Sequence, residues 1–121
     1  MAIYESAEDY LERILMLQKK IGSVRSIDIA HDMGYSKPSI SRAIKLLKES
    51  QYIIVNENGI IDFTQKGLEL ATSIYERHEL LTNFLIKIGV NEDIAKIDAC
   101  GIEHHLSEKT FEALKKHLQT L

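Results

Sequence analysis

Three helical patterns followed directly by a hairpin pattern constrain the fold of this chain more than any other feature. Helices are predicted at about 7–21, 27–33 and 37–50, with Ser6, Ser26 and Ser36 as expected N-terminal caps. Strand-forming residues follow over 52–55 and 60–63, with the turn pair Asn58-Gly59 between them. This order predicts an N-terminal winged helix-turn-helix.

The junction between the second and third helices has the residues that a helix-turn-helix needs. Ala30 supplies a small residue where two helices touch, Gly34 supplies the turn, and Ile40 supplies an apolar anchor on the next helix. Three packed helices without a ligand are the alternative interpretation of the same pattern.

The rest of the chain is predicted to be helical, which makes the protein mostly α. Helices are expected after Thr64, Asn91 and Ser107, the first ending at Gly89, the second near His105 and the third near Thr120. We therefore expect a winged helix-turn-helix domain at 1–63 and a helical metal-binding and dimerisation domain at 64–121. The last two helices carry apolar stripes suited to a dimer surface or equally to a core: Ile94, Ile97, Ile102, Leu106, Phe111, Leu114 and Leu118.

Composition narrows the compartment and the class of protein. The 121 residues are 45% apolar and contain one cysteine, so a disulfide framework and a four-cysteine zinc module are excluded. The start of the chain lacks the basic and apolar stretches of a signal peptide, and no apolar run approaches the roughly 20 residues of a membrane span. We expect a cytoplasmic protein that does not enter a membrane.

The third predicted helix is basic although the whole chain has a formal charge of −3. Between Ser36 and Lys48 there are four basic residues and no acidic residue. The first half of such a helix commonly enters the major groove. The candidate DNA-binding residues are Ser36, Lys37, Ser39, Ser41, Arg42 and Lys45. A solvated helix face is the alternative interpretation, and the hairpin tip at Asn56 and Asn58 is a weaker candidate for a DNA contact.

One segment near the end of the chain has the spacing of metal ligands. Cys100, Glu103 and His104 are at positions i, i+3 and i+4, so on a helix a thiolate, a carboxylate and an imidazole share one face. Asp9 and Glu12 form an i, i+3 pair in the first helix, and His78 lies in the middle of the long helix. Each of these features alone is common in proteins that bind no metal.

Together, these motifs resemble the metal-dependent repressors of the diphtheria-toxin-repressor and manganese-transport-regulator family. The resemblance spans nearly the whole chain and rests on Glu8-Asp9-Tyr10-Leu11-Glu12, Asp28-Ile29-Ala30, Arg77-His78-Glu79-Leu80-Leu81 and Gly101-Ile102-Glu103-His104-His105-Leu106. It implies a homodimer that binds a double-stranded DNA operator when a divalent metal is bound. The targets of such repressors are usually metal-uptake genes.

The resemblance also implies a ligand set. The manganese-type pattern falls on Asp9, Glu12, His78, Cys100, Glu103 and His104, with five of six residues matching. Cys100 replaces a carboxylate and is similar to the iron type, whereas Asp9 stands where the iron type has methionine. Thr82 and Lys96 depart from the ancillary site of the iron type, and we expect the short two-domain architecture of the manganese type.

The mixed ligand set leaves the metal open. Carboxylates and imidazole suit Mn²⁺ and Fe²⁺, while a thiolate shifts preference toward Fe²⁺, Co²⁺ or Zn²⁺. One or two ions per subunit are equally compatible with the pattern. His31 and His105 have no role in the family pattern and are expected to be exposed.

Three other functions remain compatible with the residues alone. A winged-helix regulator that answers a signal other than metal would bind DNA in the presence of a chelator. A small metallohydrolase would need an open metal position and a substrate, but no separate nucleophile or oxyanion-type loop is evident, so no enzyme and no organic substrate are expected. A metal buffer would bind the ion without a preference for DNA.

Overall fold

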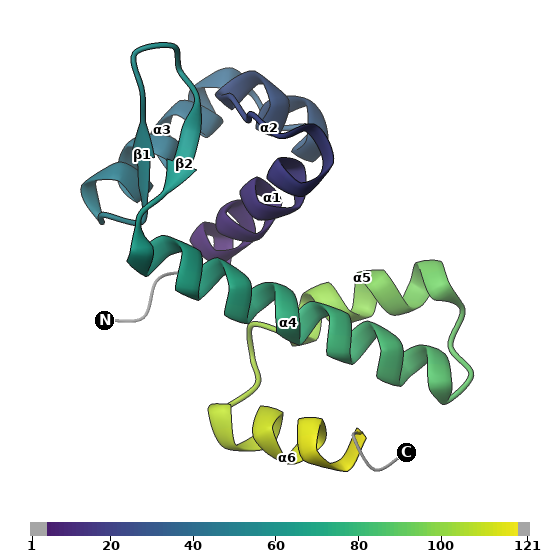
Figure 1. Ribbon diagram of the computed structural model, residues 1–121. Helices are drawn as coiled ribbons and strands as arrows, with labels where there is room; N and C mark the ends of the chain where they lie inside the picture. Colours follow the sequence, from purple (N-terminus) through teal and green to yellow (C-terminus); the bar gives the residue numbers. More distant parts are fainter. Residues whose placement is uncertain (1–4, 119–121) are drawn as a thin grey trace. The chain divides into compact units, whose positions relative to one another are not determined.

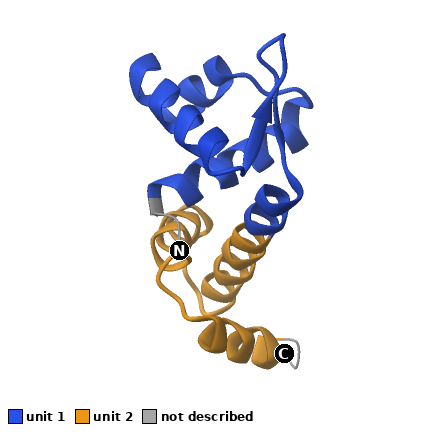
Figure 2. Ribbon diagram, turned by 90° about the vertical axis from the view of Figure 1, so that its left-hand side faces the viewer, with its two compact units in different colours: residues 1–72 blue, residues 73–121 orange. Residues whose placement is uncertain are grey.

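A computed structural model describes residues 5–118 (Figure 2). The described residues form two compact units, divided between Thr72 and Ser73. The first unit contains three helices, a two-stranded hairpin and the start of a long helix (Figure 1). The second unit contains the rest of the long helix and two further helices.

The three N-terminal helices enclose the core of the first unit. They are α1 (Glu5–Ile21), α2 (Ser26–Met33) and α3 (Lys37–Glu49). Apolar residues at helical spacing face one another, and those that are at most 1% exposed include Leu11, Ile14, Ile29, Ile40 and Leu47. Burial of such side chains contributes about 1.5–3 kcal/mol each relative to exposure, so this apolar face fixes the helix-turn-helix.

The helix-turn-helix junction is confirmed, with two corrections at helix starts. Gly34 ends α2 with a φ of 70°, and Ser36 caps α3 by accepting a 3.3 Å hydrogen bond from the Ser39 amide. Ser6 does not cap α1, because that helix already includes Glu5. Ser26 does not cap α2 either: Arg25 is the N-cap, and its amide donates to the Asp28 carboxylate at 2.9 Å.

The hairpin pairs β1 (Ile53–Val55) with β2 (Ile61–Phe63) in antiparallel register, Ile54 opposite Asp62. Its turn is not the two-residue Asn-Gly turn that the sequence favours. Gly59 has a φ of 78°, but Asn58 is not among the described non-glycine residues with positive φ. Instead, the Asn56 side chain accepts hydrogen bonds from the amides of Asn58 and Ile60, both at 2.9 Å, and thereby closes a longer turn.

The hairpin is held at both ends. At its tip side, the Ile61 amide donates to the carbonyl of Val24 at 2.8 Å, which adds a bridge to the segment before α2. At its base, Thr64 caps α4 (Gln65–Lys87) by accepting from the Gly67 amide at 3.0 Å. The Thr64 hydroxyl also donates to the Gln51 carbonyl at 2.6 Å. Thr64 therefore joins the start of α4 to the segment that leads into β1, and we call this contact region the joint between the hairpin and α4.

In the second unit, α5 (Glu92–Ile102) runs back along α4 and α6 (Glu108–Leu118) follows (Figure 1). The Asn91 side chain caps α5, and the Ser107 hydroxyl accepts from the Thr110 amide at 3.1 Å, as the sequence predicts. Gly89 terminates α4 as expected: the helix stops at Lys87, Gly89 has a φ of 104°, and the Val90 amide donates to the Leu85 carbonyl at 2.9 Å. The expected end of α5 near His105 is wrong, because that helix stops at Ile102. The expected end of the last helix near Thr120 lies outside the described residues.

None of the helices over residues 5–118 combines the length and apolarity needed to cross a membrane.

Candidate metal centre and nucleic-acid interface

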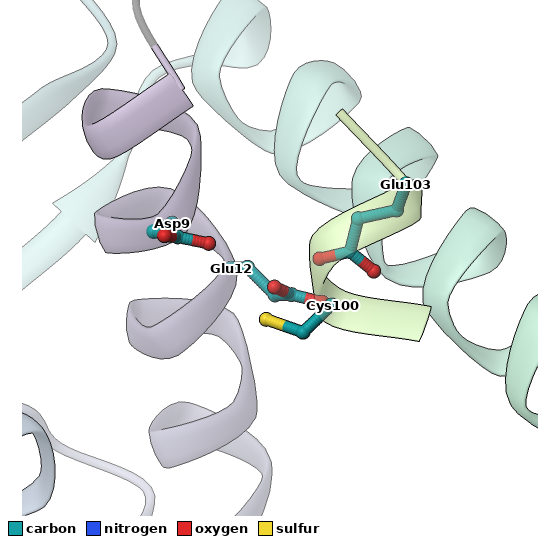
Figure 3. A group of neighbouring side chains, drawn as sticks. All are labelled: Asp9, Glu12, Cys100 and Glu103. Carbon is teal, nitrogen blue, oxygen red and sulfur yellow. The ribbon is translucent and has the colours of Figure 1, made fainter. Parts of the chain in front are cut away.

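Asp9 and Glu12 extend from the same side of α1 (Figure 3). Each contributes a carboxylate oxygen, and these oxygens lie within 4.8 Å of each other. Glu12 is only 2% exposed. Burial of a carboxylate is costly unless a cation or hydrogen-bond donor compensates it, so this pair is unlike an ordinary solvated acidic face.

The second unit places Glu103 against His78. Glu103 is 1% exposed, and its Oε2 lies 3.0 Å from Nδ1 of His78 in the middle of α4. This hydrogen bond joins residues that are 25 positions apart, and it orients both the carboxylate and the ring. Sequence reasoning singled out both residues but could not predict their contact.

Cys100 and His104 flank the same carboxylate. The Cys100 Sγ lies within 4.8 Å of a Glu103 carboxylate oxygen; Cys100 belongs to the last turn of α5, and Glu103 directly follows the helix (Figure 3). Nε2 of His104 lies 3.4 Å from Oε1 of Glu103, and the His104 side chain is 2% exposed.

The shared helical face expected for Cys100, Glu103 and His104 is wrong in one respect. Glu103 is the C-cap of α5 and keeps helical geometry, with φ −56°, ψ −28° and its amide donating to the Ala99 carbonyl at 2.9 Å, whereas His104 lies in the turn that follows the helix. Two contacts accompany this end of the helix: the amide of His105 donates to the Ile102 carbonyl three residues back, and Arg77, 26 residues away, donates to the Glu103 carbonyl.

The donor set fits a divalent transition metal. Oε1 of Glu103 is buried and makes no hydrogen bond to any residue in the described part of the chain. A buried carboxylate oxygen without a donor is costly, and a coordinated cation would remove that cost. Carboxylate oxygens, imidazole nitrogens and a thiolate are the ligands that Mn²⁺, Fe²⁺, Co²⁺ and Zn²⁺ accept.

Thr82 and Lys96, which stand where the iron type has ancillary metal ligands, do not provide comparable ligands here. Thr82 is 8% exposed, and a hydroxyl is a poor substitute for a carboxylate ligand. Lys96 forms an exposed ion pair with Glu92 at 3.4 Å. His31 and His105 are exposed, as expected.

Arg77 is a residue of this region that sequence reasoning missed as part of the site. Its guanidinium donates to the carbonyls of Glu103 and Leu106, at 3.2 and 2.8 Å. The only signal in the sequence was its place directly before His78.

The basic side of α3 is available to an anionic partner. Five of the six candidate DNA-binding residues are exposed, and Ser39 is half-buried; the five are Ser36, Lys37, Ser41, Arg42 and Lys45. Across residues 5–118, none of the three basic ones forms an ion pair with a carboxylate. Ser36 and Ser39 are partly committed to the helix start, because their hydroxyls share a 3.0 Å hydrogen bond.

An aromatic contact links α1 to the turn between α2 and α3. The rings of Tyr10 and Tyr35 meet edge to face, with centroids 6.1 Å apart. Burial and the neighbouring Tyr35 raise the pKa of Tyr10, whereas Arg42 opposes this rise. Tyr10 therefore stays neutral at physiological pH, next in sequence to Asp9.

The hairpin tip is connected to the helix-turn-helix. Nε of Arg25 donates to the Asn58 carbonyl at 3.1 Å. The Asn56 side-chain oxygen already accepts two hydrogen bonds within the turn. It is therefore a weaker candidate for a DNA contact than the sequence suggests.

Both halves of the chain match a known protein family. Residues 2–59 match the family "Iron dependent repressor, N-terminal DNA binding domain". Residues 64–121 match "Iron dependent repressor, metal binding and dimerisation domain".

Curated relatives agree with these matches. Transcriptional regulator MntR of Escherichia coli O6:H1 is 36% identical over 116 residues, which are 95% of this chain and 74% of that protein. HTH-type transcriptional regulator MntR of Bacillus subtilis strain 168 is 38% identical over 102 residues, 84% of this chain and 72% of that protein.

Solved structures share the fold. The metal-dependent transcriptional regulator MtsR matches 93% of this chain with a TM-score of 0.86 and 27% identity, and the chain covers 53% of it. A manganese-dependent transcriptional repressor in complex with manganese matches 93% of this chain with a TM-score of 0.85 and 27% identity. This chain covers 52% of that repressor, so it spans about half the length of these two structures. The chain belongs to the iron-dependent repressor family of transcriptional regulators, which includes MntR.

Proposed function

We propose that this protein is a metal-dependent DNA-binding repressor of metal-uptake genes, activated for operator binding by Mn²⁺ or Fe²⁺. The buried carboxylate of Glu103 is the observation that carries the metal dependence: Oε2 is hydrogen-bonded to His78, and Oε1 makes no hydrogen bond within the described residues. Family membership favours this function over a winged-helix regulator that answers another signal. We place the protein in the cytoplasm, where such regulators meet DNA.

The proposed ligands are the six residues that the family pattern assigns: Asp9, Glu12, His78, Cys100, Glu103 and His104. When bound, the ion supplies positive charge to the three carboxylates of this set. Cys100 must be deprotonated to take part, which makes metal affinity dependent on pH. A thiolate also allows Co²⁺ or Zn²⁺, and one or two ions per subunit are both compatible with the donors.

The proposed DNA interface is the basic side of α3, with residues 1–63 as the DNA-binding domain. Lys37, Arg42 and Lys45 supply charge to phosphates, and the serines Ser36, Ser39 and Ser41 supply donors and acceptors. One such helix covers one half-site, and specific binding by helix-turn-helix proteins normally uses two half-sites about one DNA turn apart. Residues 64–121 are proposed to provide the homodimer.

Exposed apolar side chains on α5 support that dimer. Ile94, Ile97 and Ile102 are 53%, 71% and 38% exposed, whereas Phe111 of α6 is buried at 4%. The α5 stripe is therefore the better candidate for a surface covered by a second copy, and Phe111 belongs to the core.

The coupling between metal and DNA needs only a modest free energy. A bound ion that selects a conformation with higher DNA affinity is sufficient for this coupling. An increase of 10–100-fold in DNA affinity corresponds to about 1.4–2.8 kcal/mol.

The variant Glu103→Gln tests the metal assignment, because it removes the charge and keeps the shape. We expect Mn²⁺ affinity, measured from the electron paramagnetic resonance signal of free Mn²⁺, to fall by at least about 100-fold, more than for loss of an outer-shell partner. Glu112→Gln, an exposed acid on α6, is the matched control and should bind as the unaltered protein does. Unchanged Mn²⁺ binding in Glu103→Gln would overturn the assignment.

A further inference from the structure

Arg77 makes a cluster of contacts that joins three segments of the second unit. Nη1 donates to the carbonyls of Glu103 and Leu106 at 3.2 and 2.8 Å, and Nη2 donates to the Glu108 carboxylate at 3.0 Å. The guanidinium also lies over the Phe111 ring, 5.1 Å from its centroid. The Arg77 side chain is 15% exposed, so these contacts are largely shielded from water.

The two carbonyls lie in the connection between α5 and α6. Glu103 is the C-cap of α5, where a helix leaves carbonyls without an amide partner, and Leu106 directly precedes Ser107, the cap of α6. Nη1 reaches both carbonyls, and the rigid guanidinium fork fixes Nη1 there while Nη2 binds the Glu108 carboxylate. The positive charge of Arg77 also offsets the negative end of the α5 dipole, where the acidic Glu103 is otherwise unfavourable.

Glu103 is consequently held twice by neighbouring residues of α4. Arg77 holds its backbone carbonyl, and His78 holds its side chain at Oε2. The hydrogen bond from Arg77 fixes the backbone of Glu103. The hydrogen bond with His78 fixes the rotamer of the Glu103 side chain.

We propose that Arg77 is a positioning residue that presets Glu103 for metal binding without contacting the metal. This inference rests on the proposed function, because it assumes that Glu103 is a metal ligand. The rival role for Arg77 is purely structural: its ion pair with Glu108 and its contact with Phe111 would stabilise the packing of α4 on α6. The two roles differ in which variants alter the metal site.

The variant Arg77→Lys keeps the charge and removes the fork. We expect Mn²⁺ affinity to fall about 10–100-fold, the usual effect of removing a group that orients a metal ligand. We also expect the absorption bands of bound Co²⁺ to change in energy or intensity, because a displaced Glu103 alters the ligand field. Both are measured at a temperature where circular dichroism shows every variant to be folded.

Two matched controls separate positioning from packing. Glu108→Gln removes the ion pair but leaves both carbonyl contacts, and Lys115→Met removes the Lys115–Glu76 ion pair, another link between α4 and α6. Both should keep Mn²⁺ affinity within about twofold and leave the Co²⁺ spectrum unchanged, even if they lower the unfolding temperature. If Glu108→Gln weakens metal binding as much as Arg77→Lys does, the positioning role is wrong.

A double-variant cycle tests whether Arg77 acts through Glu103. If it does, Arg77→Lys should cost no further affinity in a Glu103→Gln background, because the oriented ligand is already lost. Equal losses in the two backgrounds would overturn the inference. Absence of metal binding by the unaltered protein would instead refute the proposed function, whereas normal binding by Arg77→Lys would refute only the role of Arg77.

Discussion

At the residue scale, Gly67 shows how closely α4 approaches the hairpin. A Cβ added to Gly67 would lie 1.8 Å from the carbonyl oxygen of Tyr52, a backbone atom that no rotamer change can move. The same carbonyl accepts a hydrogen bond from the Thr64 amide at 3.1 Å. The glycine is therefore required by the joint between the hairpin and α4.

We expect Gly67→Ala to lower the free energy of unfolding by about 1–3 kcal/mol, as overpacking typically does. Thermal unfolding of the metal-free protein, followed by circular dichroism, measures the change. Gly101→Ala is the matched control: a Cβ there meets nothing within 4 Å in α5, and alanine should raise stability by up to about 1 kcal/mol. Equal stability of Gly67→Ala and the unaltered protein would show that the joint relaxes.

At the scale of elements, α3 combines a buried apolar side with an exposed basic one. Ile40, Ile44 and Leu47 are buried, and Arg42 and Lys45 lie exposed between them. The buried side anchors α3 in the core, and the exposed side leaves the positive charges of α3 available to DNA phosphates.

We expect Arg42→Ala to weaken operator binding about 10-fold or more and to reduce the dependence of affinity on salt, because one phosphate contact is lost. Fluorescence anisotropy at several salt concentrations measures both quantities. Lys116→Ala, which removes an exposed charge from α6, should change neither. An unaltered salt slope for Arg42→Ala would exclude a phosphate contact by Arg42.

The number and order of the elements follow from sequence, because apolar spacing and caps are local signals. Thr64, Asn91 and Ser107 cap helices as predicted, and each does so through a bond within three residues. Helix ends that depend on distant partners were not predictable: α5 ends early where Arg77, 26 residues away, takes the Glu103 carbonyl. The contact of His78 with Glu103 is non-local in the same way, so spacing could identify these residues but not their pairing.

At the scale of the whole molecule, the exposed stripe on α5 bears on assembly. Ile97 is 71% exposed, and exposed apolar residues grouped on one helix mark a surface that another protein covers. The matching family domain is described as a metal-binding and dimerisation domain.

We expect Ile97→Glu to weaken dimerisation at least 10-fold, because a buried charge without a partner would replace apolar contact. Sedimentation velocity over a range of concentrations measures the dimer dissociation constant. Ile54→Glu is the matched control, since Ile54 is 57% exposed on β1 in the first unit and should leave the dimer intact. A fully dimeric Ile97→Glu would place the interface elsewhere.

The most direct test of a metal-dependent repressor is DNA binding by the intact protein with and without metal. Fluorescence anisotropy would use DNA from upstream of its own gene and of neighbouring transporter genes, at fixed salt. Mn²⁺, Fe²⁺ under anaerobic conditions, Co²⁺, Zn²⁺ and a chelator would be compared. We expect Mn²⁺ or Fe²⁺ to raise affinity 10–100-fold and the chelator to abolish this gain. Equal binding in the presence of metal and of chelator would contradict metal control.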